Sequence, residues 1–136
     1  HHFLFSFSVL EHVEDFRSFY ESCSRAMAPG AWMLHLIDLG GHALFEHPLP
    51  PLDFQTYPDW LYDLMYPKYH RATRRFLSDH TQAVEAAGFS IEKVTPTNTA
   101  DEAYLDRLQP GLRRAAQERN RDELKVVEFA LLARKK

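Results

Sequence analysis

The hydrophobic residues change their spacing twice within the first 39 residues of the chain. Apolar residues at positions 3, 5, 7 and 9 share one face of an extended segment, and this alternation predicts a strand over residues 3–9. From Asp15 onwards the spacing becomes helical. Its apolar stripe consists of Phe16, Phe19, Tyr20, Cys23 and Met27. Pro29 and Gly30 end this helix, and the nearly continuous apolar run over residues 32–37 predicts a strand that is covered on both faces.

The middle of the chain is predicted to be irregular up to residue 58, because two glycines and four prolines fall within residues 40–58. A short aromatic helix is expected over residues 59–66. Its apolar positions are Trp60, Leu61, Leu64 and Met65. Next, Ser78 can cap a helix that runs to Ala87, Gly88 can end that helix, and residues 89–94 are predicted to form a strand.

The last third of the chain is predicted to hold two helices and a strand. Thr99 and Glu102 have the spacing of a capping box at the start of one helix. Pro110 suits the first turn of the other helix, and residues 124–133 predict the closing strand. Because strands and helices alternate along the chain, we expect one α/β domain over residues 1–136.

Composition and charge narrow the classes of partner. The chain is 45% hydrophobic and 26% charged, which is ordinary for one globular domain. A formal net charge of -3 and a pI near 6.2 provide no overall basic field for nucleic acid, so we expect no nucleic acid partner. The one basic cluster, Arg113, Arg114, Arg119 and Arg121, is interpreted as a solvated helix face.

The single cysteine and the length of the apolar runs indicate where in the cell the protein is expected. Cys23 has no second cysteine to pair with in this sequence, and its place on the apolar stripe predicts a buried thiol. No apolar run approaches the roughly 20 residues that cross a bilayer. The chain also opens on a strand-like pattern rather than a signal sequence. We therefore expect no membrane partner and a cytoplasmic location.

Four short motifs follow one another along the chain in a characteristic order. They are Leu10-Glu11-His12-Val13, Ala28-Pro29-Gly30, Ile37-Asp38-Leu39 followed by His42, and Leu77-Ser78-Asp79 leading to Ala86-Ala87-Gly88-Phe89. Together they resemble the carboxy-terminal half of a class I S-adenosylmethionine-dependent methyltransferase of the Rossmann-like, type 11/12-like kind. The resemblance implies parallel strands plus an antiparallel last strand, flanked by helices, with a variable insert at about residues 40–76. It also implies S-adenosyl-L-methionine as cofactor.

The glycines bear on whether this chain could catalyse the reaction alone. They lie at positions 30, 40, 41, 88 and 111, and no pair has the G-x-G spacing of a nucleotide-binding loop. The resemblance therefore implies a methyltransferase that acts on a small-molecule acceptor, but we expect the isolated chain to be inactive. The alternative is a non-catalytic remnant that serves as a dimerisation or interaction module.

The predicted strand over residues 3–9 indicates where a partner would bind, whether the chain is part of a methyltransferase or a non-catalytic module. In the resembling enzymes this strand is central, so without its neighbour it would expose an apolar edge of unpaired backbone groups. The partner is expected to be either the missing amino-terminal half or a second copy of the chain. The second possibility predicts a homodimer formed through the exposed edge strand 3–9.

The resemblance implies that the end of this first strand borders the cofactor and the acceptor, as ligands do in open α/β sheets. Ser6, Ser8 and Glu11 are the implied cofactor-binding residues. His12 and His42 are the catalytic candidates, because an imidazole titrates near working pH and can accept a proton from the methyl acceptor. The alternative for Glu11 and His12 is a structural role at the start of a helix, and for His42 a surface position in a loop.

Acceptor recognition is expected from the segment over residues 40–76. Its aromatic residues either form a lid over an apolar or planar acceptor or pack the segment onto the sheet, and the sequence does not decide between the two. The substrate-binding candidates are Trp60, Tyr66 and Arg71. Arg71 could hold an acidic group of the acceptor or make a surface ion pair.

No metal is expected at this site. Some members of the family bind a divalent metal through E-x-x-E-H, and here the first glutamate position is occupied by Ser8. Loss of a carboxylate removes both charge and a ligand from a hard-cation site, although Glu11, His12 and a water could still hold a metal weakly. The eight histidines have no ligand spacing such as H-E-x-x-H.

Overall fold

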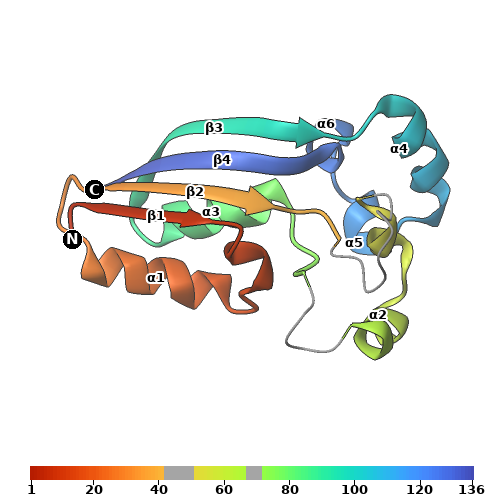
Figure 1. Cartoon of the computed structure of the whole chain (residues 1–136), viewed down its shortest axis with the longest axis horizontal. Helices are drawn as coiled ribbons and strands as arrows, with labels where there is room; N and C mark the ends of the chain where they lie inside the picture. The colour runs from red at the N-terminus through yellow and green to blue at the C-terminus, as the bar shows by residue number, and fades with distance from the viewer. Residues whose placement is uncertain (42–50, 67–71) are drawn as a thin grey trace.

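A mixed sheet organises the chain in the computed structural model, which describes residues 1–41, 51–66 and 72–136. Within these residues the sheet has four strands: β1 (Phe3–Phe7), β2 (Trp32–Asp38), β3 (Phe89–Thr99) and β4 (Val126–Lys135). Their order is β1-β2-β4-β3, with β1 parallel to β2 and β4 antiparallel to both of its neighbours (Figure 1). The sequence predicted this α/β architecture, including the antiparallel last strand.

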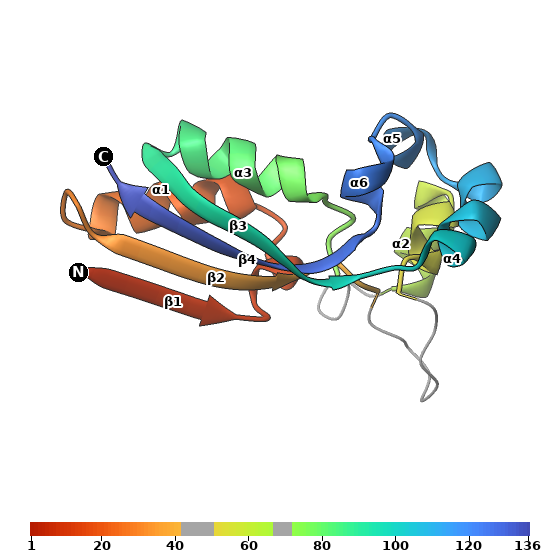
Figure 2. The same ribbon diagram turned by 90° about the horizontal axis from the view of Figure 1, so that it is seen from above.

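The helices fall into two groups. They are α1 (Phe16–Ala26), α2 (Asp59–Met65), α3 (Leu77–Ala86), α4 (Glu102–Leu108), α5 (Arg114–Gln117) and α6 (Arg121–Leu124), with 3-10 turns η1 (Leu10–His12), η2 (Asp53–Thr56) and η3 (Gln109–Gly111). Helices α1 and α3 lie on one face of the sheet, whereas α2, α4, α5 and α6 gather toward the carboxyl ends of β1 and β2 (Figures 1 and 2). In the described part of the chain, no helix is long and apolar enough to span a membrane.

The face of the sheet opposite α1 and α3 is largely uncovered by described residues (Figure 2). On β1 it exposes Phe3, Phe5 and Phe7, each by 58–59%, and on β2 it exposes Trp32 by 37%. The apolar run over residues 32–37 was expected to be covered on both faces, and for Trp32 this expectation is wrong. A nearly continuous apolar sequence signals a two-sided strand, but it cannot tell whether the covering layer lies in the same segment of chain.

Two hydrophobic clusters support the fold. The first lies between the sheet and helices α1 and α3, and fully buries Tyr20, Met33 and Phe129. It also buries Cys23, as the apolar stripe predicted. The second joins η2, α2 and α4 around Phe54. The second cluster fixes the helices that surround the candidate site.

Strand β1 ends earlier than the predicted strand over residues 3–9. Ser8 has φ = 48°, a left-handed conformation that is uncommon for a residue other than glycine. This conformation turns the chain out of the extended direction, and the 3-10 turn η1 follows at Leu10. Val9 therefore lies outside the strand and is 44% exposed.

Two predicted helix starts are wrong by a few residues. Ser78 lies inside α3, where the carboxylate of Asp79 accepts the N–H of Phe76, the N-cap residue, at 2.9 Å. The cap of α4 is Asp101, which accepts the N–H of Tyr104 at 2.8 Å, while β3 extends through Thr99. These local alternatives use the same residue types, so the sequence alone does not rank them.

Two further elements differ from their predictions. Pro110 opens only the short turn η3, which is followed by two helices of four residues each. In α2 the predicted apolar positions Trp60 and Leu64 are 68% and 76% exposed, whereas Tyr62 and Tyr66 are buried. The helix is rotated relative to its expected orientation, because the tyrosine rings fill the second hydrophobic cluster and their hydroxyl groups can be satisfied there.

Candidate functional site

The candidate site lies beyond the carboxyl ends of β1 and β2. Ligands of open α/β sheets bind at this edge, because the loops that leave parallel strands diverge there. Ser8 donates its backbone N–H to the carbonyl oxygen of Leu36 at 3.0 Å, which continues the ladder one step past β1. Its left-handed φ then directs η1 across this edge. Backbone conformations of this kind cluster at ligand sites, since the surrounding structure must hold them in place.

Glu11 and His12 differ in their environments. Glu11 is 1% exposed, whereas His12 on the same turn is exposed. The carbonyl oxygen of Glu11 accepts the backbone N–H of Thr73 at 2.5 Å, so residues from far along the chain meet η1 here. None of Ser8, Glu11 and His12 is among the described residues that line the cavity next to this junction.

Ser6 is turned toward the core rather than toward the site. Its hydroxyl group lies 2.6 Å from Nδ1 of His35, which is fully buried on β2. Burial lowers the pKa of His35 to about 4, so the ring is neutral at physiological pH. His35 is therefore a hydrogen-bonded core residue of β2.

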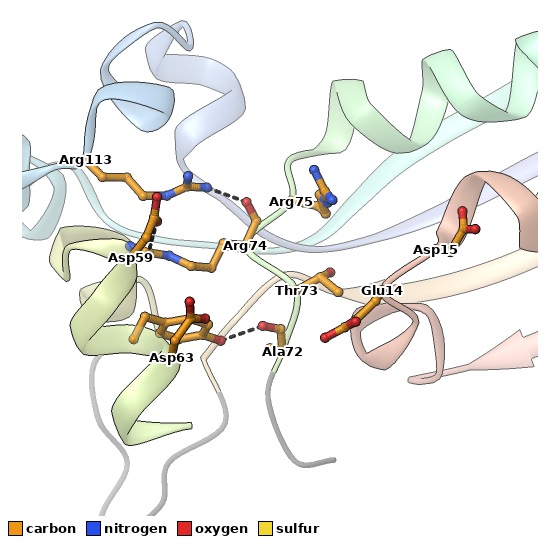
Figure 3. Close-up of a pocket in the computed structure, with 10 residues that line it drawn as sticks. Glu14, Asp15, Asp59, Asp63, Ala72, Thr73, Arg74, Arg75 and Arg113 are labelled. Carbon is orange, nitrogen blue, oxygen red and sulfur yellow. Dashed lines mark hydrogen bonds and ion pairs between the residues drawn. The ribbon is translucent and has the colours of Figure 1, made fainter. Parts of the chain in front are cut away.

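A cavity of about 620 Å³ opens between α2 and the residues that lead from η1 into α1. The described residues that line it are Glu14, Asp15, Asp59, Tyr62, Asp63, Ala72, Thr73, Arg74, Arg75 and Arg113. In Figure 3, Asp59, Asp63 and Arg113 lie on one side, Glu14 and Asp15 lie on the other, and the strip of residues 72–75 runs between them. The cavity is therefore rich in charge of both signs.

Arg74 anchors the α2 side of the cavity. Its guanidinium donates to Asp59 at 3.0 Å and to the carbonyl oxygens of Phe54 and Tyr57 at 2.8 and 2.5 Å. It also lies 4.7 Å from the ring centroid of Tyr62. Burial, followed by the nearby Arg113 charge, lowers the pKa of Arg74 to about 10, which leaves it charged at physiological pH.

Arg113 brings the carboxy-terminal helices into the same site. It donates to Oε1 of Gln55 at 2.9 Å and to the carbonyl oxygen of Arg74 at 2.6 Å. Burial lowers its pKa. The interpretation of residues 113–121 as a solvated basic face is wrong for Arg113, and also for Arg119, which pairs with Asp79 at 2.9 Å. Charge spacing indicated exposure, but aromatic rings such as Phe76 hold both guanidiniums against the protein.

The predicted acceptor residues occupy different environments. Tyr66 is buried and stacks on Tyr62 with ring centroids 4.5 Å apart. Trp60 is exposed and does not line the cavity. His42 and Arg71 lie outside the described residues. The stacked pair packs the insert onto the rest of the molecule, one of the two roles that the sequence left open.

Sequence reasoning missed the principal lining residues of the cavity. Tyr62 donates its hydroxyl proton to the carbonyl oxygen of Ala72 at 2.5 Å and so fixes the strip of residues 72–75 against α2. The spacing of Tyr62 and Tyr66 by one helical turn was the available signal for this buried face. For Arg74 and Arg113, 39 residues apart, no local signal predicts that they meet.

In residues 1–41, 51–66 and 72–136, no group of three or more histidine, cysteine, aspartate or glutamate side chains is arranged to hold a metal ion. Glu11 and His12 therefore lack a third ligand from the described part of the chain.

Comparison with solved structures identifies the fold. An S-adenosylmethionine-dependent methyltransferase from Mesorhizobium loti matches with a TM-score of 0.55 and 15% identity, over 98% of this chain and 61% of that protein. Phosphoethanolamine N-methyltransferase 2 from Haemonchus contortus, solved with S-adenosyl-L-methionine, matches with a TM-score of 0.54 and 13% identity, over 98% and 33%. The [4+2]-cyclase SpnF matches with a TM-score of 0.51 and 14% identity, over 98% and 49%.

These likenesses show that the chain has a class I methyltransferase fold, and that it spans less than two thirds of each of these proteins. The fold is not confined to proteins named as methyltransferases, because SpnF is named as a [4+2]-cyclase. No protein family description matches the sequence, and no curated protein matches it.

Proposed function

We propose that this chain is the acceptor-facing part of an S-adenosylmethionine-dependent methyltransferase that acts on a small molecule. The observation that carries the proposal is the position of the cavity. Its lining residue Thr73 is hydrogen-bonded to Glu11 of η1, and Glu14 and Asp15 follow that turn at the carboxyl ends of parallel β1 and β2. The chain shares this fold with methyltransferases. Turnover requires the glycine-rich segment of the donor site, which these 136 residues do not contain.

The roles proposed for individual residues follow from their positions. Ser8 and Glu11 form the turn against which the donor lies, and Ser6 holds that end of β1 through its contact with His35. His12, on the same turn, is exposed but does not line the cavity; it lies two residues before Glu14, which does, and is the proposed base that takes the acceptor's proton. Methyl transfer from a sulfonium mainly requires alignment of donor and acceptor, so positioning residues can supply much of the rate enhancement.

Nuclear magnetic resonance can test the proposal even if donor binding is weak. When S-adenosyl-L-methionine is added to the chain, we expect backbone amide shifts in Ser8, His12 and Thr73. The matched control is ATP, which shares the adenosine but lacks the sulfonium, and should produce smaller shifts. The absence of shifts, or shifts confined to the opposite end of the sheet at Gly30 and Lys135, would contradict the proposal.

The uncovered face of β1 supports a second candidate, a non-catalytic module that forms a homodimer. Phe3, Phe5 and Phe7 lie in one row on an edge strand, and in the described residues only β2 pairs with β1. If two copies paired antiparallel about Phe5, Phe3 of each copy would lie opposite Phe7 of the other. Such aromatic cross-strand pairs contribute about 0.2 to 1 kcal/mol each, and the pairing would also satisfy the edge backbone groups.

Sedimentation equilibrium distinguishes this second candidate. The dimer should dissociate when Phe5 is replaced by lysine, because two like charges would then lie opposite each other at the centre of the pairing. The matched control is Trp60→Lys, since Trp60 is 68% exposed and lies on α2. A monomeric wild-type chain, or an equal loss of dimer in both variants, would contradict the dimer.

A further inference from the structure

Arg75 differs from the other arginines that line the cavity. Arg74 and Arg113 are each held by carbonyl or side-chain oxygens. Arg75 is exposed, and its guanidinium carbon lies 5.2 Å from the ring centroid of Phe16. Within the described part of the chain it has no carboxylate within ion-pair distance and no side-chain hydrogen bond. Arg75 therefore lines the cavity with N–H donors that no described residue accepts.

The acidic residues of the cavity have other interactions. Asp15 caps α1 by accepting the N–H of Ser18 at 3.1 Å. Asp59 pairs with Arg74 at 3.0 Å. Glu14 and Asp63 also take part in interactions. Among the charged residues that line the cavity in the described part of the chain, Arg75 is thus the one whose side chain makes neither a hydrogen bond nor an ion pair.

A second guanidinium raises the positive potential near Arg75. Burial is the main cause of the lowered pKa of Arg113; the nearby Asp59 opposes it, and the charge of Arg75 then adds to the lowering, so the two guanidiniums are close enough to repel each other. An anion bound at Arg75 would offset that repulsion. Phe16 stacks against the guanidinium and so limits its orientations before any ligand arrives.

We propose that Arg75 binds an acidic group of the methyl acceptor, either a carboxylate or a phosphate. A guanidinium presents a planar fork of N–H donors that matches two oxygens of such a group. The cavity of about 620 Å³ has the size of a small-molecule site. In naming the acceptor class, the inference rests on the proposed function, but the anion site itself can be tested without the methyl donor.

Titration of the whole chain with inorganic phosphate, and separately with acetate, tests the inference. Both titrations are run at constant ionic strength without S-adenosyl-L-methionine, and the side-chain Nε–Hε signals of arginines are followed. We expect saturable shifts of Arg75, and about ten-fold weaker binding in Arg75→Gln, as one charge-assisted bidentate contact is lost. Arg25→Gln removes the same charge from an exposed position on α1 and should leave binding unchanged.

The probe and variant comparisons distinguish the possible outcomes. Binding of phosphate alone favours a phosphorylated acceptor, and binding of acetate alone favours a carboxylic acid. Arg75→Lys keeps the charge without the fork and should bind with intermediate strength. Linear shifts spread over many arginines, or equal binding in Arg75→Gln and Arg25→Gln, would overturn the inference.

The two proposals can fail separately. Loss of the anion site would leave any donor-induced shifts at Ser8 and His12 unaffected. Conversely, anion binding at Arg75 without a response to S-adenosyl-L-methionine would contradict the methyltransferase proposal, while the anion site would stand.

Discussion

Thr73 donates its backbone N–H to the carbonyl oxygen of Glu11 at 2.5 Å, across 62 positions of sequence. This hydrogen bond joins the strip of residues 72–75, which lines the cavity, to η1 at the end of β1. The proposed donor-binding turn and the proposed acceptor cavity therefore share one backbone contact. A change at this contact should affect both.

Replacing Thr73 with proline removes the N–H that Glu11 accepts. We expect the free energy of unfolding to fall by about 1 to 3 kcal/mol, the cost of leaving a buried carbonyl without its donor. Thr73→Ala keeps the backbone N–H and is the control. Urea denaturation measures both variants, and a Thr73→Pro protein as stable as Thr73→Ala would contradict the importance of this contact.

The buried histidines His35 and His80 should make the free energy of unfolding depend on pH. The Tyr20 hydroxyl lies 3.1 Å from Nδ1 of His80, and burial lowers the pKa of His80, like that of His35, to about 4 from an ordinary 6.5. Between these values the unfolded chain binds more protons than the folded chain, so the free energy of unfolding falls as the pH falls. Each histidine contributes up to about 1.4 kcal/mol per pH unit.

Urea denaturation at several pH values between 4 and 6.5 tests this dependence. His80→Gln removes one titrating group and should flatten the slope of stability against pH, even if it lowers stability overall. Trp60→Gln, at an exposed position on α2, changes no titrating group and should leave the slope unchanged. Equal slopes for the wild-type chain and His80→Gln would show that His80 does not titrate in this way.

Arg74 and Asp59 form an ion pair whose two members should contribute unequally. The Arg74 side chain is 8% exposed and also holds two carbonyl oxygens, whereas the Asp59 side chain is 83% exposed. Arg74→Met should lower the free energy of unfolding by about 2 to 4 kcal/mol, because buried acceptors lose their donor. Asp59→Asn should cost less than about 1 kcal/mol, since solvent screens an exposed charge.

Thermal and urea denaturation of these two variants provide the measurement for Arg74 and Asp59. Similar losses in both would mean that the ion pair, rather than the carbonyl contacts, carries the stability. A third variant, Arg74→Lys, keeps the charge but cannot reach all three acceptors. It should lie between the other two.

Two substitutions of Ser8 should differ in their effect on the free energy of unfolding. Its φ of 48° disfavours residues with a branched Cβ, so Ser8→Val should cost about 1 to 2 kcal/mol. Ser8→Gly relieves the backbone strain but increases the flexibility of the unfolded chain, so we expect a net change within about 1 kcal/mol. Denaturation midpoints of both variants check this order, and a valine variant more stable than the glycine variant would contradict it.

Much of the framework could be predicted from local sequence. The stripe from Phe16 to Met27 gave α1, the apolar run gave β2, and Gly88 marked the end of α3 with φ = 88°. These predictions succeed because periodicity and backbone freedom act over a few neighbouring residues. They fail where local alternatives compete, as when Asp101 rather than the Thr99 position caps α4.

The candidate site was less accessible to such reasoning. The motif around Leu10 located the edge of the sheet, and the resemblance to methyltransferases named the fold that comparison with solved structures then showed. It did not indicate that Arg75 and Arg113 would line one cavity. Nor did it indicate that Tyr62, rather than Trp60, would face inward.

By itself, the sequence determined the alternation of strands and helices, whereas the turn at Ser8 that ends β1 was not predicted. Only the tertiary structure decided that residues 72–75 cross between α2 and η1, and that the phenylalanine row of β1 faces outward. The reason is physical: secondary structure follows from hydrogen bonds and side-chain spacing within a short segment. A binding cavity depends on contacts between segments far apart in the chain, such as Glu11 and Thr73, whose partners no local pattern specifies.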